Sequence, residues 1–555
     1  MYIENINSPK DIKKLSVEQL SVLAEEVRTA LIRKLSEHGG HIGPNLGMVE
    51  TTIALHYVFN SPIDKIVFDV SHQSYVHKML TGRMAAFLDP AKYDDVTGYT
   101  NPDESEHDFF TIGHTSTSVS LAMGLAKGRD LTGGKENIIA VIGDGSLSGG
   151  EALEGLNNAA MLGSNMIIIV NDNDQSIAEN HGGLYKGLKE LRDTNGESPD
   201  NIFKAMGLEY YYLGDGHDVS ALIKLFTSVK DIDRAVVLHI HTIKGKGLKY
   251  AEENKEYWHA GGPFHIEDGS PKGPGWPVNE TVRESVLDLI EKRSDVVAIT
   301  AGTPSVIGFT EDYRKRAGKQ FVDVGIAEEH AVAMASGIAR NGGTPIFGVF
   351  SPFLQRTYDQ LSSDLCLNNN PAVIMVFMAS VYGMNSNTHL GIYDIPMISH
   401  IPNLVYLAPT SKEEYLAMFK YATTQKAHPI AIRIPMMMPE TGIEDTTDYS
   451  LLNKYQVVRK GSGVAIIALG DFFELGVQIA DKYKILTGND VTLINPKFIT
   501  GIDEELLECL KTDHKLVLTL EDGIVEGGFG QTIASFYGLS DMKVKNYGIK
   551  KSFPT

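Results

Sequence analysis

The sequence predicts an α/β protein of three consecutive domains, each with a mainly parallel sheet flanked by helices. Short runs rich in Val and Ile alternate with helical stretches along most of the chain, a pattern typical of parallel sheets covered by helices. Two segments, 261–277 and 436–449, interrupt this alternation. The length of 555 residues also accommodates several domains of ordinary size. We therefore predict domains at 1–262, 279–437 and 456–555.

The first predicted domain opens with a helix. Ser16 and Gln19 have the spacing of a capping box, and an apolar period of helical type continues to about Leu35. The β-rich runs that follow are 65–70, 137–142, 166–170 and 235–240. The segment 261–277 then holds five Gly and four Pro, which indicates a linker.

The second and third predicted domains repeat this alternation. The β-rich runs of the second are 296–300, 320–324, 344–349, 372–377 and 404–407, and those of the third are 464–469, 491–493 and 516–520. Residues 436–449 show neither a helical nor a strand period, so we interpret them as a second linker.

Composition excludes several classes of function. The net charge is −20, which disfavours a general nucleic-acid binder or a protein that binds anionic membranes. The two cysteines, Cys366 and Cys509, form no disulfide framework and no cysteine-based zinc site. The N-terminus lacks the pattern of a signal peptide, and the apolar runs are too short to span a bilayer. We expect a cytoplasmic protein that binds neither nucleic acid nor membrane.

Two polar motifs follow neighbouring β-rich runs of the first domain. Gly143-Asp144-Gly145 follows 137–142, and Asn171-Asp172-Asn173 follows 166–170. If the two strands pair, both motifs lie at carboxyl ends of parallel strands, where open α/β sheets bind ligands. Asp144, Asn173 and the carbonyl of Gln175 would form an oxygen-only site that suits Mg²⁺. Gly-Asp-Gly alone is more often a turn, but the two motifs one crossover apart favour the site.

These motifs, with others, resemble a known family. Gly143-Asp144-Gly145 through Asn173 resembles a thiamine diphosphate binding motif. His41-Ile42-Gly43-Pro44-Asn45, Asp69-Val70-Ser71-His72-Gln73 and Gly113-His114-Thr115-Ser116 resemble the first domain of the 1-deoxy-D-xylulose-5-phosphate synthase family. Asp323-Val324-Gly325-Ile326-Ala327-Glu328-Glu329-His330 and Phe353-Leu354-Gln355-Arg356 resemble its second domain. The similarity covers nearly the whole chain in order, and implies a transketolase-like fold.

The resemblance implies a thiamine diphosphate cofactor with Mg²⁺, and a set of residues around it. Glu328 would exchange a proton with the aminopyrimidine ring, which requires a raised carboxyl pKa. The cofactor would be lined by His72, Gly113, His114, Thr115, Asp144, Gly145, Ser146, Asn173, Lys244, Glu328 and Phe353. His41, His114, His259 and His389 would pass protons near the reacting carbons.

Three of these residues could instead have an ordinary structural role. Glu328 could serve only the dipole of a helix that begins near Ala327. Phe353 could be an ordinary core residue. Lys244, with Lys246, could be a solvated pair rather than a partner for diphosphate. The motif context favours the functional role for Glu328, whereas a core position is the more common role of any single Phe such as Phe353, and both roles stay open for the lysines.

The chain departs from the family where the acceptor phosphate would bind. Arg356 is kept, and substrate contacts would come from His41, Arg356, His389 and Asn385. A tyrosine expected by the resemblance is Phe350, two expected arginines are Met378 and Met436, and an expected aspartate is Asn385. The stretch after Asn180 is also shorter than the family pattern.

We expect a transferase that decarboxylates pyruvate and adds the two-carbon unit to an aldehyde such as glyceraldehyde 3-phosphate, as in isoprenoid precursor biosynthesis. Three alternatives stay open: a family member with a different aldehyde acceptor, a transketolase that moves a ketol unit between sugar phosphates, and a binding protein that has lost turnover. The resemblance also implies a homodimer, without deciding whether one chain or two complete the active site.

Overall fold

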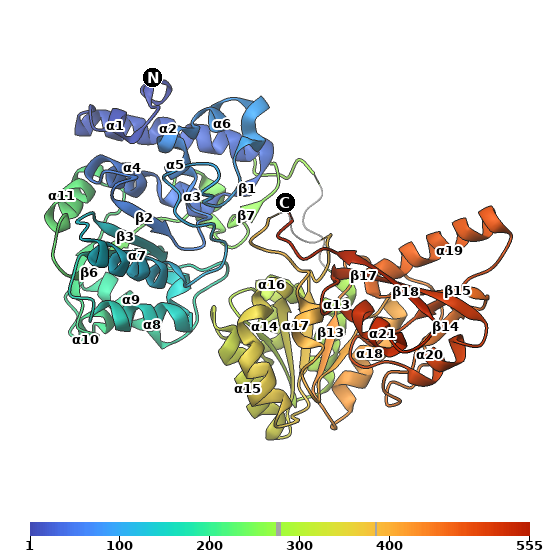
Figure 1. The fold of residues 1–555 in the computed structure, drawn as a ribbon. Helices are drawn as coiled ribbons and strands as arrows, with labels where there is room; N and C mark the ends of the chain where they lie inside the picture. Colours follow the sequence, from blue (N-terminus) through green and yellow to red (C-terminus); the bar gives the residue numbers. More distant parts are fainter. Residues whose placement is uncertain (274–278, 383–385, 555) are drawn as a thin grey trace. The chain divides into compact units, whose positions relative to one another are not determined.

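A computed structural model describes residues 1–273, 279–382 and 386–554 (Figure 1). The chain divides into two compact units. The first comprises Met1–Pro277 with Gly325–Ala327, and the second comprises Val278–Val324 with Glu328–Thr555. In the described parts of the chain, no helix is both long and apolar enough to cross a membrane.

The first unit is built on a five-stranded parallel sheet in the order β2-β3-β4-β6-β5. Its strands are β2 (Lys65–Phe68), β3 (Ile138–Gly143), β4 (Met166–Asp172), β5 (Glu209–Leu213) and β6 (Ala235–His241). Four of them coincide with predicted β-rich runs. The fifth, β5, was not predicted, because it is a half-buried edge strand of mostly polar and aromatic residues.

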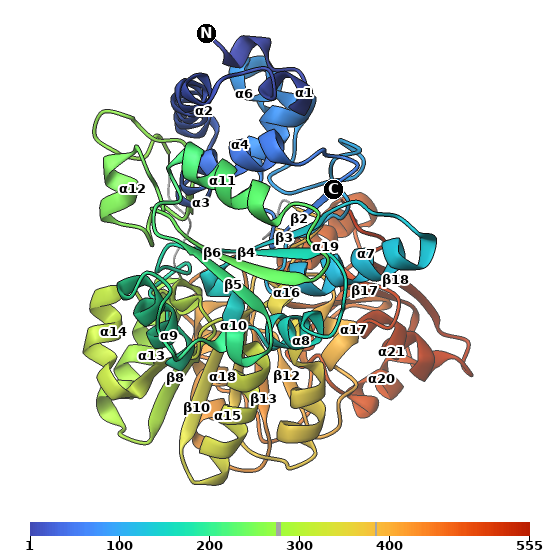
Figure 2. The same ribbon diagram turned by 90° about the vertical axis from the view of Figure 1, so that its left-hand side faces the viewer.

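Helices cover both faces of this sheet (Figure 2). One face is packed by α4 (Val49–Val58) and α11 (Val219–Val229), and the other by α7 (Ser118–Thr132), α8 (Gly150–Ala159), α9 (Gly183–Asp193) and α10 (Ile202–Ala205). The remaining helices are α1 (Pro9–Ile12), α2 (Val17–His38), α3 (Gly43–Gly47), α5 (Tyr75–Lys78), α6 (Ala85–Leu88) and α12 (Lys249–Glu253).

The first long helix, α2, begins as the sequence predicts. The Ser16 hydroxyl accepts a bond from the backbone N–H of Gln19 at 3.3 Å, and the Gln19 side chain accepts one from the N–H of Ser16 at 2.8 Å. The predicted linker at 261–277 is only partly irregular. Its first residue belongs to β7 (Ala260–Gly261), which pairs antiparallel with β1 (Gly40–His41). Residues 274–277 lie outside the described residues.

The second unit contains two sheets. The first is parallel, in the order β12-β13-β11-β10-β8-β9. Its strands are β8 (Val296–Thr300), β9 (Phe321–Asp323), β10 (Thr344–Phe350), β11 (Val373–Phe377), β12 (Val405–Leu407) and β13 (Ile430–Arg433), and its helices are α13 (Glu280–Lys292), α14 (Glu311–Ala317), α15 (Glu328–Arg340), α16 (Ser351–Leu354), α17 (Asp394–Ile398) and α18 (Lys412–Thr424). Only β13 was not predicted.

The other sheet of this unit has the order β14-β16-β15-β17-β18, and only β14 runs antiparallel to its neighbour. Its elements are β14 (Gln456–Arg459), β15 (Gly463–Ala468), α19 (Phe473–Thr487), β16 (Thr492–Asn495), α20 (Glu504–Leu510), β17 (His514–Ile524), α21 (Phe529–Tyr537) and β18 (Lys543–Ile549). The two edge strands, β14 and β18, are largely exposed and were not predicted.

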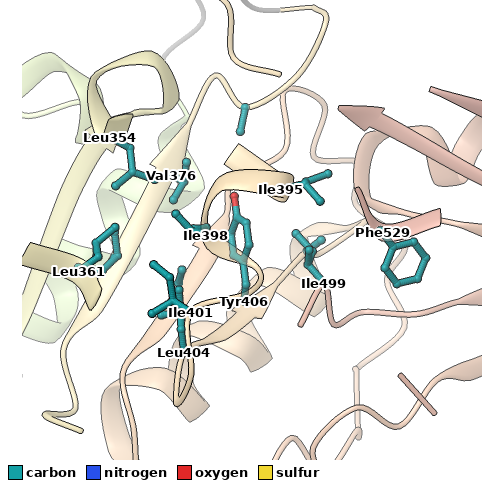
Figure 3. Packing of buried hydrophobic residues seen from close by; sticks show 14 of the residues in the cluster. Leu354, Leu361, Val376, Ile395, Ile398, Ile401, Leu404, Tyr406, Ile499 and Phe529 are labelled. Atoms are coloured by element: carbon teal, nitrogen blue, oxygen red, sulfur yellow. The ribbon is translucent and has the colours of Figure 1, made fainter. Parts of the chain in front are cut away.

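One continuous core joins the two sheets of the second unit (Figure 3). Leu354 and Val376 come from the first sheet region, Tyr406 lies at its edge strand, and Ile499 and Phe529 come from the second. The predicted linker 436–449 contains no helix or strand. The division of this unit into domains 279–437 and 456–555 remains a prediction.

Candidate active site

The two polar motifs of the first unit lie at the ends of adjacent strands. β3 and β4 are parallel neighbours, with Gly143 opposite Asn171. This pairing brings the segments that carry Asp144 and Asn173 to one edge of the sheet, as the sequence predicts. Asp144 is buried, and its Oδ2 accepts bonds from the Asn180 amide at 2.7 Å and from the backbone N–H of Gln175 at 3.1 Å.

The residues at this edge fit a magnesium site. The Oδ1 atom of Asn173 is buried and has no hydrogen-bond partner among the described residues, which leaves an amide oxygen available as a ligand. Burial and the nearby Asp172 carboxylate raise the pKa of Asp144 to about 7. A bound cation would favour the charged form of Asp144. In the described ranges, no three His, Cys, Asp or Glu side chains gather as a metal site. Only one carboxylate, that of Asp144, belongs to the predicted set.

The second carboxylate at this edge, Asp172, is already neutralised. Arg192 on α9 donates to both of its oxygens at 2.7 and 2.8 Å, and the ring of His239 bonds to it at 2.8 Å. Burial alone would raise the pKa of Asp172, but these partners lower it to about 2. Arg192 also pairs with Asp174 at 2.7 Å, so α9 is tied to the loop that carries Asn173. Arg192 and Asn180 could not be predicted as site residues, since neither belongs to a local motif.

Glycine and serine complete the loop after β3. A Cβ atom on Gly145 would stand 2.9 Å from the side chain of Ser176, so only glycine lets these two loops approach. The carbonyl of Ser146 accepts the Ser116 hydroxyl at 2.8 Å. The Tyr185 hydroxyl donates to the carbonyl of Gly145 at 3.1 Å.

Lys244 is buried, which excludes the reading of a solvated lysine pair. Its Nζ donates to the carbonyl of Ser176, beside the Asp144 site. Burial lowers the pKa of Lys244 to about 7, although Asp144 opposes this effect. The pKa values of His41 and His259 are lowered partly by Lys244. Lys244 is therefore electrostatically coupled both to Asp144 and to these two histidines.

Three of the predicted histidines pack against one another. The ring centroids are 5.0 Å apart for His41 and His72, 5.3 Å for His72 and His259, and 5.8 Å for His41 and His259. Pairing of β1 with β7 places His41 opposite Ala260, next to His259. Burial lowers the pKa of His41 to about 4 and that of His259 well below its usual value. Both imidazoles are therefore neutral at pH 7. Tyr99, which the sequence did not indicate, lies 5.6 Å from the His41 ring.

The backbone before His72 and after His114 adopts unusual conformations. Val70, Ser71 and Ser116 have φ angles of 57°, 65° and 75°, in the left-handed region. Such angles are strained for residues other than glycine and cluster at functional sites. The buried Asp69 carboxylate accepts the backbone N–H of Ser116 at 2.9 Å, which links the two segments. Gly113 is buried, and His114 and Thr115 are half-buried.

In the second unit, Glu328 is the first residue of α15 and is buried. Burial raises the pKa of its carboxyl group to about 7, although Arg356 opposes the effect with its Nη1 atom 3.9 Å from Glu328 Oε2. A carboxyl group placed only to complement the helix dipole would stay ionised in solvent, so the buried position favours the functional reading. Arg356, predicted to contact substrate, lies beside this carboxyl group.

Phe353 and His389 lie together in the same unit. Their ring centroids are 5.7 Å apart with the planes near perpendicular, and Phe350 lies 5.9 Å from Phe353. Phe353 is half-buried, so part of the ring stays accessible. The Nδ1 of His389 bonds to the hydroxyl of Thr388 at 2.8 Å. Asn385, predicted to contact substrate, lies outside the described residues.

The two methionines that replace expected arginines lie at strand ends of the second unit. Met378 directly follows β11 with a φ of 53°, and Met436 follows β13 by three residues. The nearby Arg433 is buried and bonded to Asp394 at 2.8 Å and to Asp522. Arg433 is therefore committed to a structural ion-pair cluster within this unit.

Comparisons with known proteins cover almost all of the chain. The family model described as 1-deoxy-D-xylulose-5-phosphate synthase matches residues 3–198 and 193–242, the transketolase pyrimidine binding domain matches 277–439, and the transketolase C-terminal domain matches 453–551. The transketolase from Campylobacter jejuni, a solved structure, is 16% identical with a TM-score of 0.40, covering 97% of this chain and 96% of that chain.

Curated relatives are similar to this chain over almost their full length. The 1-deoxy-D-xylulose-5-phosphate synthase of Carboxydothermus hydrogenoformans is 37% identical over 595 aligned residues, covering 100% of this chain and 94% of that protein. The enzyme of the same name from Clostridium beijerinckii is 37% identical over 596 residues, covering 99% of this chain and 95% of that protein. These alignments are longer than the 555 residues of the chain, so the relatives carry insertions. The chain belongs to the 1-deoxy-D-xylulose-5-phosphate synthase family.

Proposed function

We propose that this protein is a thiamine diphosphate-dependent transferase that decarboxylates pyruvate and joins the remaining two-carbon unit to glyceraldehyde 3-phosphate. The observation that carries the proposal is the buried Glu328 carboxyl group with a pKa raised to about 7, at the position of the family motif. A carboxyl group with this pKa can both hold and release a proton at neutral pH. The full-length relatives named for this synthase support the same reaction over a transketolase.

The residues described fit the cofactor that the family implies. Asp144, Asn173 and the Gln175 carbonyl would hold Mg²⁺, and Lys244 would neutralise diphosphate charge. Thiamine diphosphate, when bound, supplies the nucleophilic carbanion of the reaction. Glu328 would hold a proton at its carboxyl group toward the aminopyrimidine ring.

Further residues would act on the substrates. The neutral imidazoles of His41 and His259 would accept hydrogen bonds from substrate hydroxyl groups. His72, Gly113, His114, Thr115, Gly145, Ser146 and Phe353 would line the cofactor, and Arg356, His389 and Asn385 would contact substrate. We also propose a homodimer, which light scattering of the purified protein would test.

The test is product formation from defined substrates. The protein is incubated with Mg²⁺, thiamine diphosphate and pyruvate, with and without glyceraldehyde 3-phosphate, and CO₂ release and product identity are followed by NMR. We expect the aldehyde to trigger CO₂ release and 1-deoxyxylulose 5-phosphate to appear. Glu328→Ala should abolish turnover while Mg²⁺ binding is retained.

Two further arms separate the alternatives. Unphosphorylated glyceraldehyde tests whether Met378 and Met436 have removed the need for a phosphate. A ketose phosphate in place of pyruvate tests ketol transfer. CO₂ release that responds equally to both aldehydes would contradict the assigned acceptor. No CO₂ release with any aldehyde would overturn the proposed reaction.

A further inference from the structure

Three buried side chains of the first unit form a hydrogen-bonded chain that the proposed reaction does not use. Arg28 comes from α2, Glu50 from α4, and His217 from the turn before α11. Glu50 bonds to Arg28 through one carboxylate oxygen and to the His217 Nδ1 through the other, at 2.9 Å. All three side chains are at most 4% exposed. Burial alone would raise the pKa of Glu50, but His217 and Arg28 together lower it.

This chain of side chains holds both ends of the loop that carries Lys244. His217 Nε2 accepts the backbone N–H of Ile243 at 2.8 Å. Arg28 Nη1 donates to the carbonyl of Lys246 at 3.2 Å. Because Nε2 accepts a hydrogen bond, the ring proton resides on Nδ1, which donates it to Glu50. The backbone is thus fixed on either side of Lys244.

Helix α3 holds the middle of the same loop. The N–H of Gly245 donates to the carbonyl of Gly43 at 3.0 Å. A Cβ atom on Gly43 would stand 3.1 Å from Cγ and 3.3 Å from Cε of Lys244, so the lysine stem runs directly over this glycine. The side chain ends at the Ser176 carbonyl, to which its Nζ donates a hydrogen bond.

Fixing the backbone on both sides of Lys244 helps to keep its side chain buried. A buried ammonium group is costly, and a long flexible side chain leaves a buried position when its backbone can move. A loop that is hydrogen-bonded at both ends removes that freedom. We propose that Arg28, Glu50 and His217 are positioning residues that hold Lys244 in place and thereby set the affinity for the cofactor's diphosphate. This inference rests on the proposed function, in which Lys244 faces the diphosphate.

The test is a double-mutant cycle on the full-length protein, read out by calorimetric titration with thiamine diphosphate in excess Mg²⁺. His217→Phe removes both hydrogen bonds of the ring, and His217→Gln keeps one donor and one acceptor. We expect His217→Phe to weaken binding about tenfold, the size of one lost charge-assisted hydrogen bond, and His217→Gln to recover most of it. In a Lys244→Met background, His217→Phe should change affinity less than about twofold, since interacting residues are not additive.

A matched control separates positioning from a general loss of stability. His56 is buried on the same helix as Glu50, and its Nε2 bonds to His77 at 2.9 Å. His56→Phe should lower the unfolding temperature but leave the affinity for thiamine diphosphate unchanged. If His217→Phe fails to fold, Glu50→Gln takes its place, because it keeps side-chain size but removes the charge that holds Arg28.

The outcomes distinguish a failure of the positioning inference from a failure of the assigned diphosphate site. If Lys244→Met weakens binding but His217→Phe does not, or if the two effects simply add, the positioning inference is wrong and the proposed function stands. If Lys244→Met binds thiamine diphosphate as the wild type does, the assigned diphosphate site itself fails, and the positioning inference falls with it. Titration with inorganic pyrophosphate and Mg²⁺ should show the same pattern as the cofactor.

Discussion

Replacing Glu328 by Gln should stabilise the protein, and by an amount that depends on pH. Glu328 is 3% exposed, and burial raises its pKa from an ordinary value of 4.5 to about 7. Each unit of pKa corresponds to about 1.4 kcal/mol, so keeping this carboxyl group ionised in the folded state costs about 3 kcal/mol. Glutamine has nearly the same shape and cannot ionise.

The direction of this pH dependence follows from which state, folded or unfolded, binds the proton of Glu328 more tightly. The folded state holds the proton of Glu328 up to about pH 7, whereas the unfolded chain releases it near pH 4.5. The favourable contribution of the protonated group is therefore full below pH 4.5 and is lost as the pH rises through 7. Relative to wild type, Glu328→Gln should gain about 2–3 kcal/mol more at pH 8 than at pH 5.

The assay is denaturant unfolding of the protein without cofactor at both pH values. Glu329→Gln is the matched control, because Glu329 lies in the same helical turn but is less buried. This control should show no comparable difference between the two pH values. A gain from Glu328→Gln that is equal at pH 5 and pH 8, or larger at pH 5, would refute the argument from burial.

Three other perturbations have definite expected results. Ser71→Ala should cost about 1–3 kcal/mol of unfolding free energy, because the buried Ser71 hydroxyl bonds to the Ile112 carbonyl and to the Thr100 N–H. Ser71→Gly should cost about 1 kcal/mol less than Ser71→Ala, since glycine tolerates the φ of 65°. Equal losses of unfolding free energy for the two variants in chemical unfolding would argue against backbone strain at this position. Mg²⁺ alone should raise the unfolding temperature more at pH 8 than at pH 6, because Asp144 must lose its proton to coordinate, and Asp144→Asn should reduce this pH dependence in thermal scans. Arg433→Met should cost about 3–5 kcal/mol in chemical unfolding, because it leaves two buried carboxylates without their cation; a loss below 1 kcal/mol would show that the cluster is dispensable.

The sheets could be predicted from sequence wherever a strand is buried on both faces. Runs such as 166–170 are continuously apolar because helices cover both sides of the sheet, and these runs appear as strands in the structure. The strands that escaped prediction are mostly half-exposed edges, β5, β14 and β18, whose mixed residues lack such a run. Edge strands gain much of their stability from a neighbour that the local sequence does not reveal.

Some residues of the candidate site could likewise be predicted from the sequence, and others could not. Asp144 and Asn173 could be placed at one sheet edge because a single crossover joins their strands. Parallel neighbours end at the same edge of a sheet, so the residues that follow them lie close together. Lys244 was ambiguous, because only its packing on α3 shows that the lysine is buried. Arg192 and His217 could not be found, since their partners lie far away in sequence and neither residue belongs to a motif.

Charge balance at the sheet edge links α9 to the predicted metal site. Two carboxylates, Asp144 and Asp172, are close enough that the second raises the pKa of the first. Arg192 on α9 pairs with Asp172 and helps to keep that carboxylate ionised, and the pKa of Asp144 stays raised to about 7 with this ion pair in place. The family model matches the chain in two segments that meet at 193–198, directly after α9. The ion pair between Arg192 and Asp172 therefore lies within the part of the chain that matches the family model.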